Sequence, residues 1–284
     1  MIVIHTIADC RREREKLGRI ALVPTMGALH AGHISLVDIA KRHAEKVAVS
    51  IFVNPTQFGP REDFAKYPRP LENDLARCRD AGVDLVFNPT EEEMYPPDSI
   101  AEVQLDMPGF SAVLEGRVRP HHFKGVCQVV AKLFNILTPQ AAVFGQKDYQ
   151  QYVIIKAMAR ALNWPVEIIS GPTMRESDGM AMSSRNQYLS AAERERGLSI
   201  SKGLFAARDE FGKGIVQTNR LLATMQHMLL DPGSQGRVPM AVDYVAAVDA
   251  ESLKGVEVVA QPTVLAVAAR VGATRLIDNV ILEP

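Results

Sequence analysis

Apolar and polar positions form two alternating kinds of block along the first 170 residues. Short apolar runs of strand length occupy residues 20–23, 47–53, 83–87, 141–144 and 166–170. Between these runs, apolar residues recur every three or four positions, which is the spacing of a helix with one buried face. The clearest case is residues 122–137. Strands that alternate with helices favour a parallel, doubly wound sheet covered by helices on both faces.

The pattern changes after Gly171-Pro172. A polar loop over residues 174–189 precedes two helical segments, a turn-rich stretch and three strands, at 191–211, 218–230, 231–236, 242–248, 263–269 and 274–282. Helices followed by strands without alternation indicate a small α+β domain. We therefore predict an α/β protein with a Rossmann-like doubly wound domain over residues 1–172 and a smaller α+β domain over 173–284.

Two histidines lie where the first strand gives way to a helix, in the stretch Pro-Thr-Met-Gly-Ala-Leu-His-Ala-Gly-His at residues 24–33. In doubly wound sheets this turn is the usual nucleotide site, because a helix N-terminus offers unpaired N–H groups and a partial positive charge. Gly27 and Gly32 let the backbone approach a ligand. His30 and His33, three residues apart, can point to the same side. A His-x-x-His pair alone more often caps backbone groups or lies on the surface.

Three further segments carry polar groups at strand ends or in loops, at residues 54–58, 145–151 and 182–186. We expect these segments and the histidine stretch to converge at the carboxyl edge of the sheet. Lys147 can reach a phosphate as a mobile charge, and Arg185 offers a planar fork of donors. Asp148 suits a ribose hydroxyl or a helix cap equally well.

Two glutamines, Gln57 and Gln151, have amides that can bind a carboxylate or a hydroxyl. Taken singly, each is better explained by a surface or structural role. The acidic run at residues 91–93 is interpreted as a solvated connection without a function.

Composition narrows the class of protein. The chain has 284 residues, is 47% hydrophobic and carries a formal net charge of −1, so it gives no reason to expect nucleic acid or an anionic membrane as a partner. No apolar run reaches the length of a transmembrane helix, and the charged N-terminal region does not have the pattern of a signal peptide. Cys10, Cys78 and Cys127 are odd in number and widely spaced, which fits buried thiols in a reducing cytosol.

Taken together, six stretches resemble the pantothenate synthetase (pantoate–β-alanine ligase) family of the nucleotidyltransferase superfamily, with its His-x-Gly-His-type motif. They are Pro-Thr-Met-Gly-Ala-Leu-His, Phe-Val-Asn-Pro-Thr-Gln-Phe, Glu-Asp-Phe-x-x-Tyr-Pro-Arg, His-His-Phe-x-Gly-Val, Phe-Gly-Gln-Lys-Asp-Tyr-Gln-Gln and Met-Ser-Ser-Arg-Asn. Their order and spacing match that family over almost the whole chain. Ala31 departs from the family pattern, in which an acidic residue is common, and we expect it to face outward.

The resemblance implies a ligase that joins (R)-pantoate to β-alanine with ATP and Mg²⁺, through a pantoyl adenylate, with release of AMP and pyrophosphate. It implies a cytoplasmic homodimer whose domain at 173–284 closes over the site. Gln57 and Gln151 would bind pantoate, Asp74 matches a position linked to Mg²⁺, and His122 has no assigned role.

The same resemblance implies the ATP-binding and catalytic residues. ATP would contact Met26, Gly27, Ala28, Leu29, His30, Ala31, Gly32, His33, Gly145, Gln146, Lys147, Asp148, Met174, Met182, Ser183, Ser184 and Arg185. His33 would donate a proton, while His30, Lys147 and Arg185 would stabilise charge on the departing pyrophosphate.

Other functions remain open at this point. A cytidylyltransferase-type enzyme shares the histidine motif, but would keep the nucleotide in its product and would leave the two glutamines unexplained. An aminoacyl-tRNA synthetase would need a basic surplus or a separate region for tRNA. A nucleotide-sensing module would bind ATP without releasing pyrophosphate.

Overall fold

The computed structural model describes residues 1–60, 62–97, 103–230 and 238–284, so the turn-rich stretch expected at 231–236 lies outside the described residues. The chain forms two compact units. The first comprises Met1–Ala112, Arg119–Gln146 and Gln151–Pro172, and the second comprises Val113–Val118, Lys147–Gln150 and Thr173–Pro284. Two short segments therefore belong to the second unit although their neighbours in sequence belong to the first.

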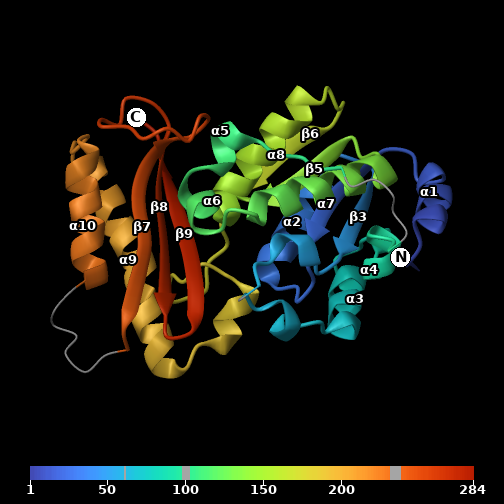
Figure 1. Ribbon diagram of the computed structural model, residues 1–284, viewed down its shortest axis with the longest axis horizontal. Coiled ribbons are helices and arrows are strands. Elements are labelled where there is room, and N and C mark those ends of the chain that lie inside the picture. Colours follow the sequence, from blue (N-terminus) through green and yellow to red (C-terminus); the bar gives the residue numbers. More distant parts are fainter. Residues whose placement is uncertain (61, 98–102, 231–237) are drawn as a thin grey trace. The chain divides into compact units, whose positions relative to one another are not determined.

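A six-stranded parallel sheet forms the centre of the first unit (Figure 1). Its strands are β1 (Ile2–Ile4), β2 (Ile20–Thr25), β3 (Lys46–Ile51), β4 (Leu85–Phe87), β5 (Ala141–Gly145) and β6 (Glu167–Gly171). They lie in the order β1-β4-β3-β2-β5-β6, and every pairing is parallel. The predicted doubly wound sheet is thus confirmed, with its change of direction between β2 and β5.

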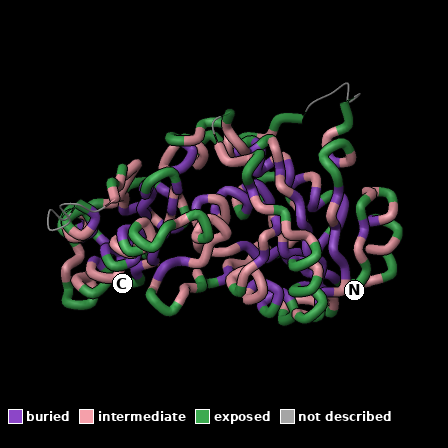
Figure 2. The backbone as a smooth tube through the Cα atoms, turned by 90° about the horizontal axis from the view of Figure 1, so that it is seen from below, coloured by how far each residue is buried: buried purple, intermediate pink, exposed green. Residues whose placement is uncertain are grey.

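Both faces of this sheet are buried, as the uninterrupted apolar strands predict. The helices of the unit are α1 (Ile7–Glu15), α2 (Ala31–Ala40), α3 (Leu71–Asp80), α4 (Glu91–Met94), α5 (Pro108–Ser111), α7 (His122–Leu137) and α8 (Tyr149–Ala161), the last of which begins in the second unit. Because successive side chains of a strand point to opposite faces, Ile20 and Leu22 pack with α1, α7 and α8, while Ala21 and Val23 pack with α2 and α3. The strands β2, β3, β4 and β5 consist mainly of buried residues, and Figure 2 draws the buried stretches of the backbone in purple.

Pro24 separates β2 from β5 where the histidine stretch begins. Ile20 donates its N–H to the side chain of Gln140 (2.7 Å), and its carbonyl accepts from the Gln140 backbone N–H (3.0 Å). The backbone N–H and C=O groups of the even-numbered residues of β2 therefore point toward β5. Pairing between the strands is limited to Ala21 with Ala141 and Leu22 with Ala142. The next N–H on that side would belong to Pro24, which has none. The two strands therefore part at the position where doubly wound sheets bind ligands.

The second unit is built on an antiparallel sheet of β7 (Met240–Asp249), β8 (Thr263–Val271) and β9 (Thr274–Leu282) (Figure 1). Two long helices, α9 (Ala191–Gly212) and α10 (Thr218–Leu230), bury apolar residues against this sheet, among them Leu204, Leu221 and Leu265. The predicted α+β arrangement is confirmed for these elements.

A buried ionic cluster attaches α6 (Leu114–Val118) to the sheet of the second unit. The carboxylate of Glu115, 7% exposed, accepts two bonds from Arg275 (2.6 and 2.8 Å) and one from the Tyr244 hydroxyl (2.8 Å). Arg275 also donates to Asp243 (2.7 Å). Burial lowers the pKa of Arg275, but its bonds to Glu115 and Asp243 outweigh this effect and raise the pKa overall. Arg275 therefore remains charged over the working pH range of an enzyme.

The sequence analysis missed several short elements, namely β1, α4, α5 and α6. The acidic run at 91–93, interpreted as a solvated connection, forms the helical turn α4, which Thr90 caps by accepting from Glu93 N–H. Glu93 also accepts from the backbone N–H of Ile7 (2.7 Å), so one of its acidic groups has a structural role. Helix α2 begins at Ala31, earlier than the periodicity indicated, because His30 acts as its N-cap.

The three cysteines are free and buried, as predicted. Burial raises the pKa of the Cys10 and Cys127 thiols to about 12 and that of Cys78 to about 11. Such thiols stay protonated and unreactive near neutral pH. Within the parts of the chain that the structure describes, no helix combines the length and the apolar character needed to span a membrane.

Replacement of Glu115 by alanine should destabilise the second unit by roughly 3 kcal/mol, because it leaves the Arg275 guanidinium buried without its main partner. Differential scanning calorimetry measures the effect. Glu210→Ala is the matched control, since it removes a solvent-exposed pair with Lys213 (3.2 Å) and should change stability by less than about 0.5 kcal/mol. Equal effects of the two substitutions would contradict the proposed importance of the buried cluster.

Candidate active site

The loop that leaves β2 adopts an uncommon backbone conformation. Gly27 and Ala28 both have positive φ, +81° and +50°. A Cβ added to Gly27 would lie 3.0 Å from an Asp74 carboxylate oxygen and 3.1 Å from Ile51 Cγ2. Glycine is therefore required there both for its conformational freedom and for the close approach of the backbone to its neighbours.

Asp74, on α3, holds this loop in place. Its Oδ2 accepts from the N–H of Ala28 (2.8 Å) and its Oδ1 from the N–H of Leu29 (2.7 Å), and the residue is only 1% exposed. Burial raises the pKa of Asp74 more than these two backbone donors lower it. Two backbone bonds to one rigid carboxylate fix the path of the chain just before the histidines.

The side chains of His30 and His33 lie side by side, with ring centroids 4.1 Å apart, as their spacing predicted. His30 Nδ1 accepts from Gly32 N–H and His33 Nδ1 from His30 N–H, both at 3.2 Å. In the neutral rings the proton is therefore on Nε2. The histidines thus cap the helix through one nitrogen and present an N–H donor through the other. His33 is half-buried rather than exposed, whereas Ala31 is exposed as expected.

A second group of polar residues surrounds Gln57, at the end of the 3₁₀ turn η1 (Pro55–Gln57) after β3. Asn54, 1% exposed, donates to Gln57 Oε1 (3.1 Å) and to the Gly125 carbonyl (3.1 Å), and accepts from the Tyr95 hydroxyl (2.8 Å). Burial raises the pKa of Tyr95 to about 12, so its hydroxyl stays a donor. This network directs Gln57 Nε2 toward Met26, 3.1 Å from its sulfur.

Helix α7 positions the backbone of Gln57 as well. A Cβ on Gly125 would overlap the carbonyl of Thr56, so only glycine allows α7 to pack this closely against η1. His122 Nδ1 lies 2.9 Å from the Gln57 carbonyl oxygen, which requires an N–H on that nitrogen, and Arg119 donates to the same oxygen (3.3 Å). His122, to which the sequence assigned no role, therefore helps to hold the Gln57 segment.

An ion pair fixes Arg119 in turn. Its guanidinium donates to both carboxylate oxygens of Glu62, at 2.8 and 2.5 Å. Burial acts to raise the pKa of Glu62, but the bonds from Arg119 outweigh it and the pKa is lowered. This pair gives the Glu-Asp-Phe stretch a structural role beside the Gln57 segment.

Apart from Gly145 and Gln146, which end a segment of the first unit, the remaining predicted ATP-binding residues belong to the second unit. Residues 174–182 form a small hairpin in which Met182 N–H donates to the Met174 carbonyl (2.9 Å) and Glu176 N–H donates to the Met180 carbonyl (2.8 Å). Ser183 then caps the 3₁₀ turn η4 (Ser184–Tyr188) by accepting from Arg185 N–H (3.3 Å). The stretch expected to be a loop is thus an ordered hairpin followed by a helical turn.

Lys147 and Asp148 lie in the 3₁₀ turn η3 (Gln146–Asp148), just before α8. The Lys147 carbonyl accepts from Asn279 Nδ2 (2.9 Å), and the Tyr149 hydroxyl donates to the Ala250 carbonyl (3.0 Å). The neighbouring Gln150 is 5% exposed and bonds to Glu115 N–H and to the Val113 carbonyl. Gln151, which is predicted to bind pantoate, is half-buried. It is the first residue of the segment 151–172, which belongs to the first unit.

These contacts bring the predicted segments together within each unit, and the convergence of all four at one edge of the sheet stays a prediction. In the first unit the histidine stretch meets the Gln57 segment, and in the second the Lys147 turn and the hairpin share contacts with β9. Sequence reasoning missed two residues that position Gln57, Asn54 and Gly125. The sequence offered one signal for each. Asn54 is a polar residue directly after an apolar strand, and Gly125 is a glycine inside an apolar helix.

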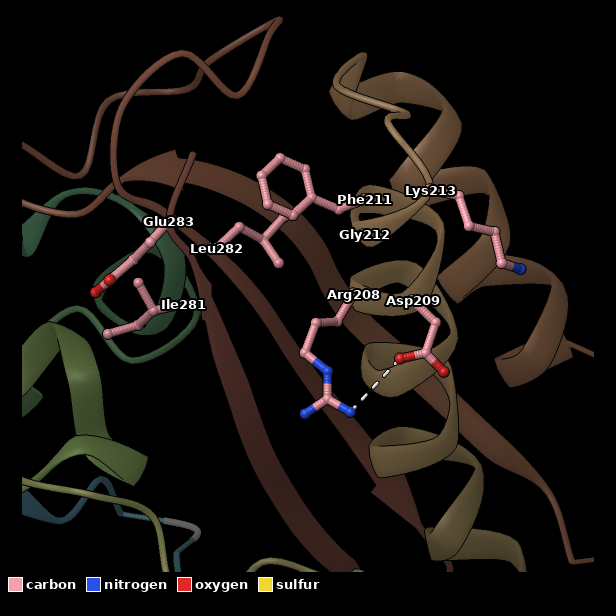
Figure 3. A pocket seen from close by; sticks show the side chains of 8 residues that line it. All are labelled: Arg208, Asp209, Phe211, Gly212, Lys213, Ile281, Leu282 and Glu283. Atoms are coloured by element: carbon pink, nitrogen blue, oxygen red, sulfur yellow. Dashed lines mark ion pairs between the residues drawn. The ribbon is translucent and has the colours of Figure 1, made fainter.

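An open hollow in the second unit lies where α9 and β9 end, away from the predicted residues of that unit (Figure 3). Its lining includes Phe211, Leu282 and the charged residues Arg208, Asp209 and Lys213. Arg208 pairs with Asp209 at 3.5 Å. None of the predicted site residues contributes to this hollow, so we do not assign it to the active site.

Asp74 is the residue that the sequence predicts to bind a metal ion. Among the described residues, no three His, Cys, Asp or Glu side chains are grouped closely enough to hold a metal ion. Asp74 is buried and both of its oxygens already accept backbone N–H groups. These contacts support a role in holding the loop, and a direct bond from Asp74 to Mg²⁺ stays a prediction.

Comparison with known proteins identifies the family. The model of the pantoate-beta-alanine ligase family matches residues 2–281. The chain belongs to the pantoate–β-alanine ligase family. It is a ligase that condenses pantoate with β-alanine to form pantothenate. The family membership and the enzyme class predicted from the motifs are thereby confirmed.

Relatives of this ligase extend over its whole length. The pantothenate synthetase of Thermobifida fusca is 49% identical, over 99% of this chain and 95% of the relative. The pantothenate synthetase of Thermus thermophilus, known from a crystal structure, is 42% identical in sequence. The alignment covers 100% of both chains, with a TM-score of 0.93. A pantoate-beta-alanine ligase from Francisella tularensis, solved in complex with β-γ ATP and β-alanine, is 33% identical over 99% of this chain and 97% of that one, with a TM-score of 0.79.

Substitution of Asp74 by asparagine should lower turnover at least tenfold, because an amide nitrogen would face one of the two backbone N–H groups that the carboxylate now binds. Steady-state assays of pantothenate formation measure the effect. Asp80→Asn, an exposed substitution on the same helix, is the control and should leave turnover unchanged. Normal turnover in Asp74→Asn would show that the ligase does not depend on this clamp.

Substitution of Gly125 by alanine should raise the KM for pantoate severalfold and destabilise the protein by about 1–3 kcal/mol, since the new methyl group must displace the backbone before Gln57. Gly109→Ala is the matched control, because a Cβ at Gly109 meets no atom within 4 Å. An unchanged KM in a folded Gly125→Ala protein would argue against this packing as a determinant of pantoate binding.

Proposed function

We propose that this ligase uses ATP and passes through a pantoyl adenylate, in the two steps that the family resemblance implies. The observation that carries the proposal is the pair of Nε2–H donors of His30 and His33 at the N-terminus of α2, beside the opening between β2 and β5. That position offers a nucleotide both the helix terminus and two imidazole rings. The Francisella relative was solved in complex with β-γ ATP and β-alanine, which supports ATP as a substrate.

In the first step, the carboxylate of (R)-pantoate attacks the α-phosphorus of ATP and pyrophosphate leaves. A free carboxylate is a poor acyl donor because its leaving group would be oxide, whereas the adenylate can release AMP. Negative charge grows on the departing pyrophosphate, and donors already in place there lower the barrier. We propose that His33 donates a proton in this step and that His30, Lys147 and Arg185 stabilise the developing charge.

ATP binding is proposed to involve the residues that the family resemblance implies. From the first unit we assign Met26 to His33 together with Gly145 and Gln146. From the second unit we assign Lys147, Asp148, Met174 and residues 182–185. The ordered hairpin and the backbone-capped turns support this assignment, since phosphates are held best by groups that are fixed before binding.

Pantoate is proposed to bind through the amides of Gln57 and Gln151. Asn54 accounts for the orientation of Gln57, because it donates to the carbonyl oxygen of that side chain and leaves the NH₂ group as the donor to the substrate. In the second step the amine of β-alanine attacks the adenylate carbonyl and AMP leaves. Water would destroy the adenylate, and for this reason we propose that the domain at 173–284 closes over the site during the reaction.

Three further features belong to the proposal. Mg²⁺ would arrive on the phosphates of ATP, as it commonly does in nucleotide enzymes, and Asp74 is the residue that the family resemblance links to it. A homodimer is proposed on family resemblance. A cytoplasmic location is supported by the three buried thiols, which suit a reducing compartment.

Pyrophosphate release from ATP and Mg²⁺ tests the two-step scheme, with pantoate and β-alanine each omitted in turn. We expect release to require pantoate and continuous turnover to require β-alanine, with AMP as the nucleotide product. Release that is independent of pantoate, or a product that retains the nucleotide, would overturn the scheme.

Substitution of His33 by alanine tests the proposed proton donor. We expect kcat to fall by roughly 10²–10³, because the substitution removes a donor that acts on the departing pyrophosphate. His43→Ala, which removes a half-buried histidine just beyond the same helix, should leave kcat unchanged. Circular dichroism establishes that both variants are folded, and normal kcat in folded His33→Ala would remove the proposed role.

A further inference from the structure

Two adjacent buried polar residues of β9, Asp278 and Asn279, are not explained by the reaction or by the packing of the sheet. Each is 4% exposed, in a strand whose other inward positions are largely apolar. Successive side chains of a strand point to opposite faces. Asp278 therefore lies on the face that carries Leu276 and Val280, toward α9 and α10, and Asn279 lies on the face that carries Arg275.

Asp278 holds the hairpin at residues 174–182. Its two carboxylate oxygens accept from the two terminal nitrogens of Arg175, at 2.7 and 2.9 Å. Arg175 also donates to the Gly179 carbonyl across the hairpin (3.1 Å), and its guanidinium lies 4.8 Å from the centre of the Phe205 ring. A planar guanidinium bound in this two-pronged way fixes orientation as well as distance.

Asn279 holds the turn that contains Lys147. Its Nδ2 donates to the Lys147 carbonyl at 2.9 Å. This carbonyl belongs to the peptide group that joins Lys147 to Asp148, so the bond sets the position from which both side chains extend. The lysine side chain itself is long and mobile, and the placement of its backbone decides where its charge can reach.

The two residues are also bonded to each other, and both accept from Arg175. The backbone N–H of Asn279 donates to Asp278 Oδ1 (2.7 Å), and Arg175 donates to the Asn279 carbonyl (3.3 Å). Both residues are paired with β8 through the sheet, Asp278 with Val267 and Asn279 with Ala266. The hairpin and the Lys147 turn are therefore tied to one short, rigid piece of strand.

We propose that Asp278 and Asn279 are positioning residues for ATP, which together set the placement of the Lys147 turn relative to the hairpin at 174–182. The inference rests on the proposed function, in which both segments bind the nucleotide. It adds that the separation between the Lys147 turn and the hairpin is fixed by two adjacent residues, whose side chains project from opposite faces of β9. A site built on a rigid element holds its geometry better than one built on independent loops.

Asn279→Ala is the first test, with Thr218→Val as a matched control. Thr218 is also 4% exposed in the same unit, and its hydroxyl donates to the Val256 carbonyl (2.6 Å), so the control loses one buried bond of the same kind away from both segments. We expect similar falls in melting temperature. The KM for ATP should rise about five- to tenfold in Asn279→Ala only, as the loss of one positioning bond predicts, with the KM for β-alanine unchanged.

Arg175→Lys tests the other face, because lysine keeps the charge but loses the two-pronged bond to Asp278. We expect this variant also to raise the KM for ATP. The double variant Arg175→Lys/Asn279→Ala should differ from the product of the single effects by more than about twofold, since contacts in one network are not additive. Independent effects would show that the two segments are held separately.

The outcomes separate this inference from the proposed function. Failure of the wild-type enzyme to form AMP from ATP in a pantoate-dependent reaction would overturn the proposed function itself. If the wild type does form AMP in this way, but Asn279→Ala matches Thr218→Val in its KM for ATP, Asn279 has only a structural role and the inference is overturned.

Discussion

The absence of one backbone N–H, at Pro24, shapes the whole of the first unit. Neighbouring strands of a parallel sheet are held together by a ladder of backbone hydrogen bonds. Here the ladder between β2 and β5 ends after Leu22 and Ala142. The chain beyond Pro24 is therefore paired only with β3, not with β5, and it turns after Thr25 into the loop that carries the histidines. Asp74 supplies the acceptors that this loop would otherwise lack, so the opening in the sheet is stabilised rather than left loose.

Buried polar side chains that bond to backbone groups recur around every predicted substrate-binding segment. Asp74 bonds to the N–H groups before the histidines, Asn54 bonds to the Gly125 carbonyl and orients Gln57, and Asn279 bonds to the Lys147 carbonyl. Each lies on or directly after a regular element, and each is almost fully buried. The groups predicted to meet substrate are thus held by a second set of residues whose rotamers are fixed by packing, which reduces the entropy lost on binding.

The sequence predicted what local periodicity determines and missed what distant contacts determine. Helices α7 and α10 begin and end where their apolar spacing indicated, and β9 was placed correctly. Helix α6 is different, because Leu114 adopts a positive φ of +46° and the helix is stabilised by Glu115 bonding to Arg275, 160 positions later. The histidine pair was recognised from its motif, but its half-buried state and its cap bonds depend on the loop conformation. The partners of Asp74 and Asn279 likewise carry no local signal.

The division of the chain has a consequence for how this enzyme can be assembled and altered. The polypeptide passes between the two units five times, at residues 112/113, 118/119, 146/147, 150/151 and 172/173. A fragment that begins after Pro172 lacks the two inserted segments, and would leave Arg275 without Glu115 and Asn279 without the Lys147 carbonyl. During synthesis on the ribosome, residues 113–118 and 147–150 are made before the strands of the second unit that they contact. The second unit therefore cannot complete its fold until its last strands have been synthesised. Exchange of C-terminal halves between distant relatives would therefore break contacts that no single crossover point preserves.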